Sequence, residues 1–144
     1  MAAALNSGSR GRLRTATHAA HARVDACFPR GLGSAAQYRQ YLIGMHAVVG
    51  ARERALSDAA LTAPWSSWRK PERVDWLEAD LASLQAAPLQ SGPGLRIAGV
   101  AEAAGALYVV EGSALGATQL LGDACAMGWT DRQGVRFLHG HGGD

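Results

Sequence analysis

The segment from Ile97 to Met127 constrains the fold most, because it is long, mostly apolar and charged at only three positions: Glu102, Glu111 and Asp123. It shows no sustained alternation of apolar and polar residues, which would be typical of a strand. We therefore expect one long helix that packs into a core. Glu102 and Glu111 argue against a membrane span, because an acidic residue at the centre of a bilayer costs roughly 2.5 to 3.5 kcal/mol.

Apolar and small residues also recur with helical spacing in three shorter segments. Pro29 ends the first of these patterns. Ser34 and Gln37 have the spacing of a capping box at the start of the second, and Pro71 fits the first turn of the third. With the long segment included, the expected helices cover residues 13–28, 34–56, 71–84 and 97–127.

Thr130 and Gln133 are expected to cap a short final helix. No internal repeat is visible, and no segment alternates as a strand would. The sequence therefore predicts an all-α bundle. A chain of 144 residues has room for one core, which we place in a single domain at residues 11–138, with a disordered leader at 1–10 and a flexible tail at 139–144.

Composition narrows the classes of function. Fourteen Lys and Arg against 12 Asp and Glu give a net charge of +2, which argues neither for a nucleic-acid partner nor for a membrane surface. Cys27 and Cys125 are too few for a disulfide scaffold, and the chain has no CxxC pair. The first ten residues have no apolar run of the kind found in a secretory signal, so we expect a cytoplasmic protein.

His21 is the first candidate for chemistry, because it falls on the apolar stripe of the first expected helix and its imidazole should point inward. A buried neutral imidazole needs a hydrogen-bond partner. Asp25, one turn on, could accept from one ring nitrogen and leave the other to bind a metal. The alternative is a core histidine satisfied by its own helix. A zinc site from His18 and His21 would lack further ligands.

Three glycines in the long helix are the second candidate. Each costs roughly 1 kcal/mol relative to alanine inside a helix, so something must offset Gly105, Gly112 and Gly116 together. Gly112 and Gly116 are four residues apart and expose bare backbone on one face. Either another helix packs closely there, or a flat ligand lies on the backbone where a side chain would collide.

The two candidates together resemble the haem oxygenases of the bacterial, biliverdin-producing type. The first motif is LRTATHAAHARVD (Leu13 to Asp25), which looks like the family's proximal helix. The second is GALYVVEGSALGA (Gly105 to Ala117), which looks like the distal helix of the bacterial members. The resemblance spans roughly Arg10 to the C-terminus. It implies a haem-oxygenase-like helical bundle lacking the C-terminal helices with which family members continue.

On the proximal side, the resemblance implies roles for three residues. His21 would be the axial ligand to the haem iron, leaving the opposite face of the iron open to O2. Asp25, where the family often has Glu, would hold the imidazole through its other nitrogen. Arg14 takes the place of the basic residue that meets a haem propionate, a contact that Arg can make bidentately.

On the distal side, the resemblance implies that Gly112 and Gly116 let the helix lie almost against the macrocycle. Ser113 stands where many animal enzymes have an aspartate that organises distal water. Its hydroxyl, or other residues, would take over that role here.

The activity implied is oxidative cleavage of haem to biliverdin, CO and ferrous iron. Haem is both cofactor and substrate, O2 is the oxidant, and electrons come from ferredoxin or a reductase. The protein supplies orientation and a proton network, while the redox chemistry belongs to haem. The resemblance also implies a bacteriophytochrome as client for the biliverdin.

Two alternatives remain open. One is a non-catalytic haem-binding or scaffold module of the same fold, motivated by Ser113 and by the end of the chain before the family's further helices. The other is a different helical enzyme on this architecture, such as a thiaminase-like protein. That enzyme would need a cysteine or carboxylate site in the bundle, and neither cysteine is placed for one.

Overall fold

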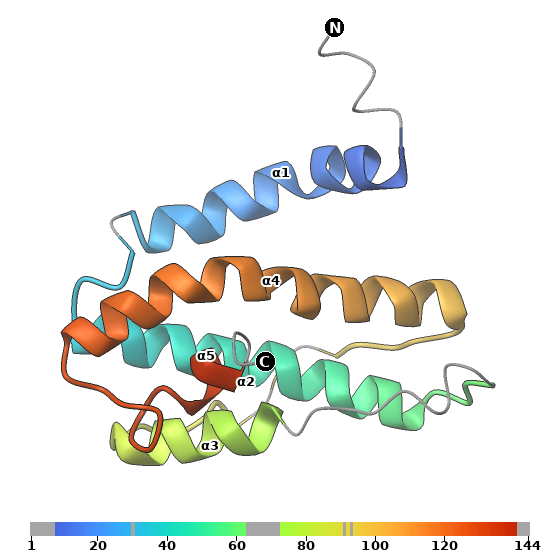
Figure 1. The fold of residues 1–144 in the computed structure, drawn as a ribbon. Helices are drawn as coiled ribbons and strands as arrows, with labels where there is room; N and C mark the ends of the chain where they lie inside the picture. The colour runs from blue at the N-terminus through green and yellow to red at the C-terminus, as the bar shows by residue number, and fades with distance from the viewer. Residues whose placement is uncertain (1–7, 30, 63–72, 91, 93, 141–144) are drawn as a thin grey trace, which may run out of the picture. The chain divides into compact units, whose positions relative to one another are not determined.

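The computed structural model describes residues 8–29, 31–62, 73–90, 92 and 94–140, which form α-helices and no strand (Figure 1). The predicted all-α class is confirmed. The helices are α1 (Ser9–Cys27), α2 (Ala35–Asp58), α3 (Arg73–Ser83), α4 (Val100–Ala126) and α5 (Arg136–Gly140).

The bounds of the first four helices agree with the expected ones to within a few residues. The first helix begins at Ser9, inside the expected leader, and His139 of the expected tail lies in α5. Pro71 lies outside the described residues. None of the helices in the described ranges is both long enough and apolar enough to cross a membrane.

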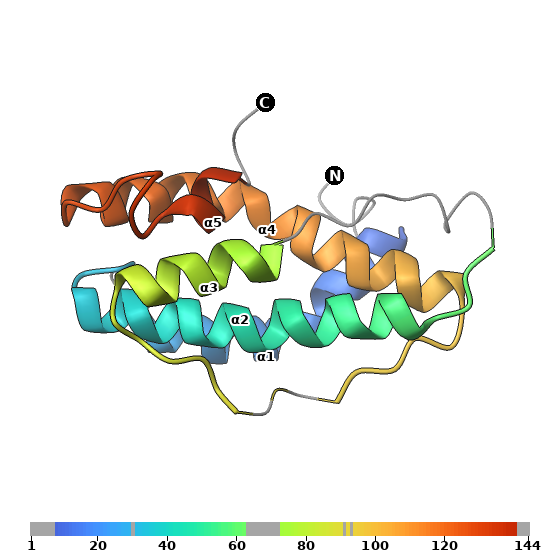
Figure 2. The ribbon, with the colours of Figure 1, turned by 90° about the horizontal axis from the view of Figure 1, so that it is seen from below.

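The chain divides into two compact units, Met1–Gly31 (unit 1) and Leu32–Asp144 (unit 2). Unit 1 contains α1. In unit 2, α3 and α4 both pack against α2 and run antiparallel to it, and α5 contacts α3 and α4 (Figure 2). Three buried residues, Leu56 of α2 with Ala103 and Leu107 of α4, form a core cluster where α2 ends and α4 begins. Burying one such leucine stabilises the fold by about 1.5–3 kcal/mol.

The predicted capping box at the start of α2 is present. The Ser34 hydroxyl accepts a hydrogen bond from the Gln37 amide N–H at 3.2 Å. The Gln37 side chain reaches back and accepts from the Gly33 amide at 2.9 Å, one residue before the cap. Both bonds are local, so the residue types and their spacing were enough to predict where α2 begins.

The expected cap of the final helix is wrong. Thr130 and Gln133 bond to each other's backbone in a turn, at 3.0 and 2.9 Å, and α5 begins at Arg136. Its cap is Asp80 of α3. The two carboxylate oxygens of Asp80 accept from the amides of Arg136 and Phe137 at 2.9 and 2.8 Å. A carboxylate at a helix N-terminus satisfies free amides and complements the helix dipole.

Tyr38 of α2 holds the backbone that leads into α5. Its hydroxyl donates to the Gly134 carbonyl oxygen at 2.6 Å, and its side chain is fully buried. The Tyr38 and Tyr41 rings stack with centroids 6.5 Å apart. Burial raises the pKa of Tyr41 to about 12 and raises that of Tyr38 further, with Asp80 adding to the effect on Tyr38. Both phenols are therefore held in the neutral form.

We expect Asp80→Ala to destabilise unit 2 by about 3 kcal/mol, because it leaves the buried amide of Phe137 and the part-buried amide of Arg136 without an acceptor. Asp131→Ala, the same substitution in an exposed loop, should change stability by less than about 0.5 kcal/mol. Urea unfolding followed by far-ultraviolet circular dichroism measures both. Equal effects of the two substitutions would contradict the role given to Asp80.

The raised tyrosine pKa values predict a loss of stability at high pH. A phenol whose pKa is higher in the folded state contributes stability that is fully present below pH 10 and is lost as pH rises through the folded pKa. The free energy of unfolding should therefore fall between about pH 10 and 12. Tyr38→Phe should lower stability at pH 7 by about 1 kcal/mol and make this alkaline decline shallower. A decline of unchanged steepness would contradict the assignment to Tyr38.

Candidate functional site

The predicted site residues divide between the two units. Unit 1 contains Arg14, His21 and Asp25, and unit 2 contains Gly112, Ser113 and Gly116.

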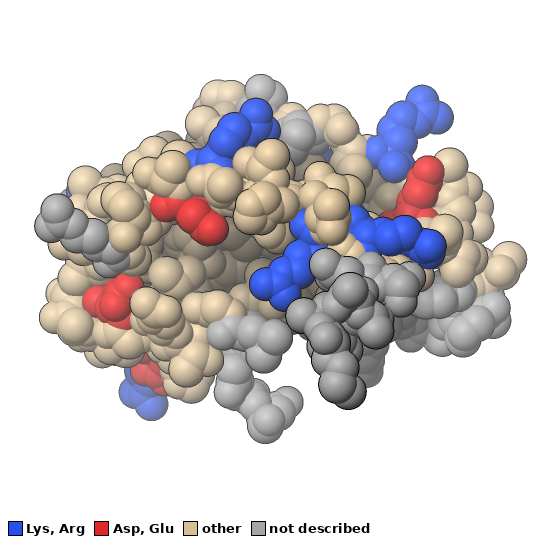
Figure 3. Space-filling model, turned by 90° about the horizontal axis from the view of Figure 1, so that it is seen from above, with Lys and Arg blue, Asp and Glu red and all other residues tan. Residues whose placement is uncertain are grey.

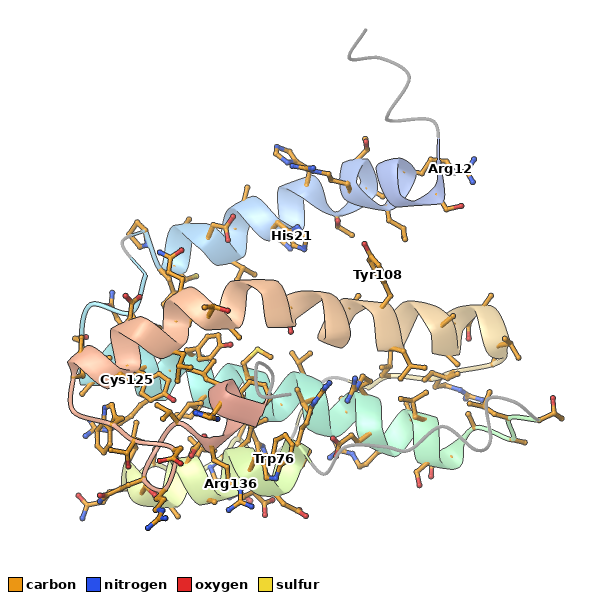
Figure 4. The ribbon with its side chains drawn as sticks, in the orientation of Figure 1. Arg12, His21, Trp76, Tyr108, Cys125 and Arg136 are labelled. Atoms are coloured by element: carbon orange, nitrogen blue, oxygen red, sulfur yellow. The ribbon has the colours of Figure 1, made fainter. Side chains whose placement is uncertain are left out.

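In unit 1, His21 is exposed, and Figure 4 shows its imidazole projecting from α1. Unit 1 by itself does not bury this ring, so the inward orientation of the α1 stripe stays a prediction. Leu13 and Val24 of the same stripe are 49% and 60% exposed. The physical reason is that a single helix offers no second surface within its own unit to cover an apolar face.

The environment of His21 leaves its nitrogens accessible. Within the part of the chain that the structure describes, no hydrogen bond joins His21 to Asp25, although the two are one turn apart. Arg14, His18 and Asp25 are exposed as well. No group of three or more His, Cys, Asp or Glu side chains that could hold a metal ion occurs among the described residues.

In unit 2, the glycines of α4 face open space. At Gly105, Gly112 and Gly116, no described atom of unit 2 would lie within 4 Å of an added Cβ. Close helix packing within unit 2 therefore does not account for these glycines. The bare backbone from Gly105 to Gly116 extends over about 16 Å at a rise of 1.5 Å per residue.

Two apolar side chains of α4 near these glycines are exposed and were not singled out from the sequence. Tyr108 projects from α4 in Figure 4 and is half exposed, and Val109 is 63% exposed. Ser113, on the turn that begins at Gly112, is also exposed. The uncovered surface of α4 thus combines bare backbone, one hydroxyl and apolar side chains. That combination suits a flat, largely apolar ligand with a few polar atoms.

Other glycines of unit 2 are tightly packed, which makes the open ones distinctive. An added Cβ at Gly134 would lie 2.9 Å from both Leu84 and Trp129, and the Gly134 backbone has φ +97°. At Gly140 the same atom would collide with the Trp76 ring. These two glycines are required by packing, whereas Gly112 and Gly116 are not.

Comparison of the chain with protein-family models, with curated proteins and with solved structures finds no match.

The two kinds of glycine should respond in opposite ways to the same substitution. Gly112→Ala should raise the free energy of unfolding by about 0.5–1 kcal/mol, because it adds helix propensity in open space. Gly134→Ala should lower it by about 2 kcal/mol or more, through left-handed backbone strain and collision with Trp129. Urea unfolding of both variants measures the two values. Destabilisation by Gly112→Ala would show that a part of the protein packs against this backbone.

Proposed function

We propose that this chain is a haem oxygenase that cleaves haem to biliverdin, CO and ferrous iron. The observation that carries the proposal is the pair of motifs in one helical chain: the Leu13–Asp25 segment around His21, and the Gly105–Ala117 segment with its uncovered glycines. All-α architecture and agreement of the helix bounds with the two motifs are consistent with it.

Two features of the described residues are compatible with haem binding. The first is the backbone at Gly112 and Gly116, which leaves a surface that a Cβ would fill and that a flat ring could approach. The second is the exposed imidazole of His21, whose nitrogens have no hydrogen-bond partner among the described residues and can therefore ligate iron. Neither feature is required for packing within its own unit.

In this proposal, each of the predicted site residues has one role in binding haem. The His21 imidazole binds the haem iron through a ring nitrogen, and Asp25 can turn to accept a hydrogen bond from the other. The Arg14 guanidinium binds a propionate carboxylate through paired N–H donors. Gly112 and Gly116 admit the ring edge to the backbone of α4. The Ser113 hydroxyl would hold a water molecule and pass a proton to it.

Bound haem supplies the oxygen and redox chemistry, with O2 as oxidant and external electrons from a ferredoxin or a reductase. The exposed apolar residues Tyr108 and Val109 shield the ring from water on the α4 side. A bacteriophytochrome is the proposed recipient of the biliverdin, and the cytoplasm is the proposed compartment.

Haemin titration tests the binding part of the proposal. The wild-type chain should develop a Soret band at one equivalent of haemin, and His21→Ala should lose the band or shift it. His18→Ala is the matched control, because His18 is an exposed histidine of the same helix and should bind haemin as the wild type does. Identical spectra for wild type and His21→Ala would exclude His21 as the ligand.

Supplying electrons separates the enzyme from a haem-binding module without turnover, the alternative favoured by serine at position 113 in place of an acid. With haemin, O2 and a ferredoxin system, the enzyme bleaches the Soret band and develops biliverdin absorbance. A stable Soret band under these conditions would leave binding as the function. Gly116→Ala should weaken haemin binding while stabilising the apoprotein, because the added methyl group occupies the ring's surface.

A further inference from the structure

The first residue of unit 2, Leu32, is held firmly within that unit. Its side chain is only 3% exposed, and its amide donates a hydrogen bond to the Asp123 carboxylate of α4 at 3.0 Å. The next two residues, Gly33 and Ser34, take part in the capping bonds at the start of α2. The chain that arrives from α1 is therefore attached to α4 at a defined point, the Leu32–Asp123 bond.

Asp123 does not stabilise the helix that contains it. It lies in the last turn of α4, which ends at Ala126, and no basic residue lies in this turn. The C-terminal end of a helix carries a partial negative charge, so a carboxylate there is unfavourable. Its partner Leu32 is 91 residues away in the sequence, and hydrogen bonds to a carboxylate are stronger than those between neutral groups. Asp123 thus contributes to the attachment of Leu32 and not to the helix.

The described residues give Asp123 no second role as a cation ligand. No group of three or more His, Cys, Asp or Glu side chains that could hold a metal ion occurs among them. On the face of the molecule seen in Figure 3, acidic side chains, in red, lie in small separate groups with uncharged surface between them.

The Leu32–Asp123 bond lies on the same face of α4 as the uncovered glycines. At about 100° per residue, Asp123 projects within about 20° of both Gly112 and Gly116. At a rise of about 1.5 Å per residue, Gly116 lies about 10 Å and Gly112 about 16 Å before Asp123 along the helix. The chain from α1 therefore joins α4 on the face that the proposed function assigns to haem.

The connection between α1 and Leu32 is short. α1 ends at Cys27, and the Gly31 amide donates to the Phe28 carbonyl oxygen at 3.1 Å, which closes a turn. This turn limits the Cα of Cys27 to within about 15 Å of the Cα of Leu32, whatever direction α1 takes.

We propose that Asp123 is a positioning residue for haem: its bond to Leu32 fixes the end of α1 at the glycine face of α4, so that His21 and the two glycines contact one ring. This role rests on the proposed function. His21 lies about 9 Å before the end of α1, similar to the about 10–16 Å that separates the glycines from Asp123. The two halves of the proposed site are therefore level with each other when α1 runs alongside α4.

The expected effect on affinity follows from the connection between the units. A ring that two units bind from opposite sides depends on the effective concentration of one unit near the other, which falls as the free connection lengthens. Loss of the Leu32–Asp123 bond lengthens it.

Haemin titration of the whole chain measures this effect through the Soret band that depends on His21. Asp123→Ala should raise the Kd for haemin about tenfold, the factor expected for one hydrogen bond to a charged group. Asp123→Asn keeps an oxygen that accepts from the Leu32 amide and should stay within about twofold of wild type. Asp131→Ala, in an exposed loop, is the matched control and should bind as wild type does. Circular dichroism checks that Asp123→Ala stays folded, as expected because alanine suits the last turn of a helix better than aspartate.

The two native cysteines allow a second measurement on the apoprotein. Cys27 ends α1, Cys125 follows Asp123 on α4, and both thiols are free and exposed. Nitroxide labels on both report the distance between them by electron paramagnetic resonance. Wild type and Asp123→Asn should give one narrow distance distribution, and Asp123→Ala should give a broader one.

Three results would overturn the role of Asp123: equal label distances in wild type and Asp123→Ala, equal haemin affinity of the two, or a loss in Asp123→Asn as large as in Asp123→Ala. The last would assign the effect to charge. Failure of the proposed function looks different, because wild type itself would then show no Soret band that depends on His21. That result would overturn the role in haem binding, whereas the label distances would still decide whether Asp123 fixes the end of α1.

Discussion

The arrangement of unit 2 depends on the buried carboxylate of Asp80. Burial raises its pKa, and the amides of Phe137 and Arg136 lower it again by donating to the ionised oxygens. A single buried acid is costly unless such donors surround it. α5 is too short to be stable by itself, and it forms because Asp80 accepts its first amides while Phe137 and Leu138 enter the core. α3 and α5 are thereby stabilised together.

Three further polar contacts of unit 2 between distant residues lie at the same end of the helices. The Tyr38 hydroxyl, the Arg39 guanidinium and the Asp123 carboxylate bond there to the backbone of Gly134, Leu84 and Leu32. The contacts of His46 with Glu78 and of the Arg73 amide with Glu53 lie farther along α2. The opposite end, where α2 ends and α4 begins, is held by the apolar cluster around Leu107. Non-directional apolar packing allows many arrangements of the helices, and directional bonds at the other end select one of them.

The sequence predicted what local rules determine. Apolar spacing predicted four helices, and Ser34 with Gln37 predicted where α2 begins, because those bonds span three or four residues. The start of α5 was predicted wrongly, since its cap comes from Asp80, 56 residues away, and no local pattern signals such a partner. For the glycines, the sequence left two explanations open. The structure removes helix packing within unit 2, and haem remains a proposal.

Local apolar spacing was enough to predict the helix α1, but it does not supply a partner surface, and within unit 1 the side chains of α1 are mostly exposed. A helix with a stripe of two large apolar residues among alanines gains little by burying it, so charge at its edges has more influence on what it binds. His21 and the Arg12–Arg23 pair lie about 160–180° apart around α1, at about 100° per residue. Arg12 and Arg23 therefore lie on a different side of α1 from the proposed iron ligand, and substitutions at these arginines should leave the His21 imidazole in place.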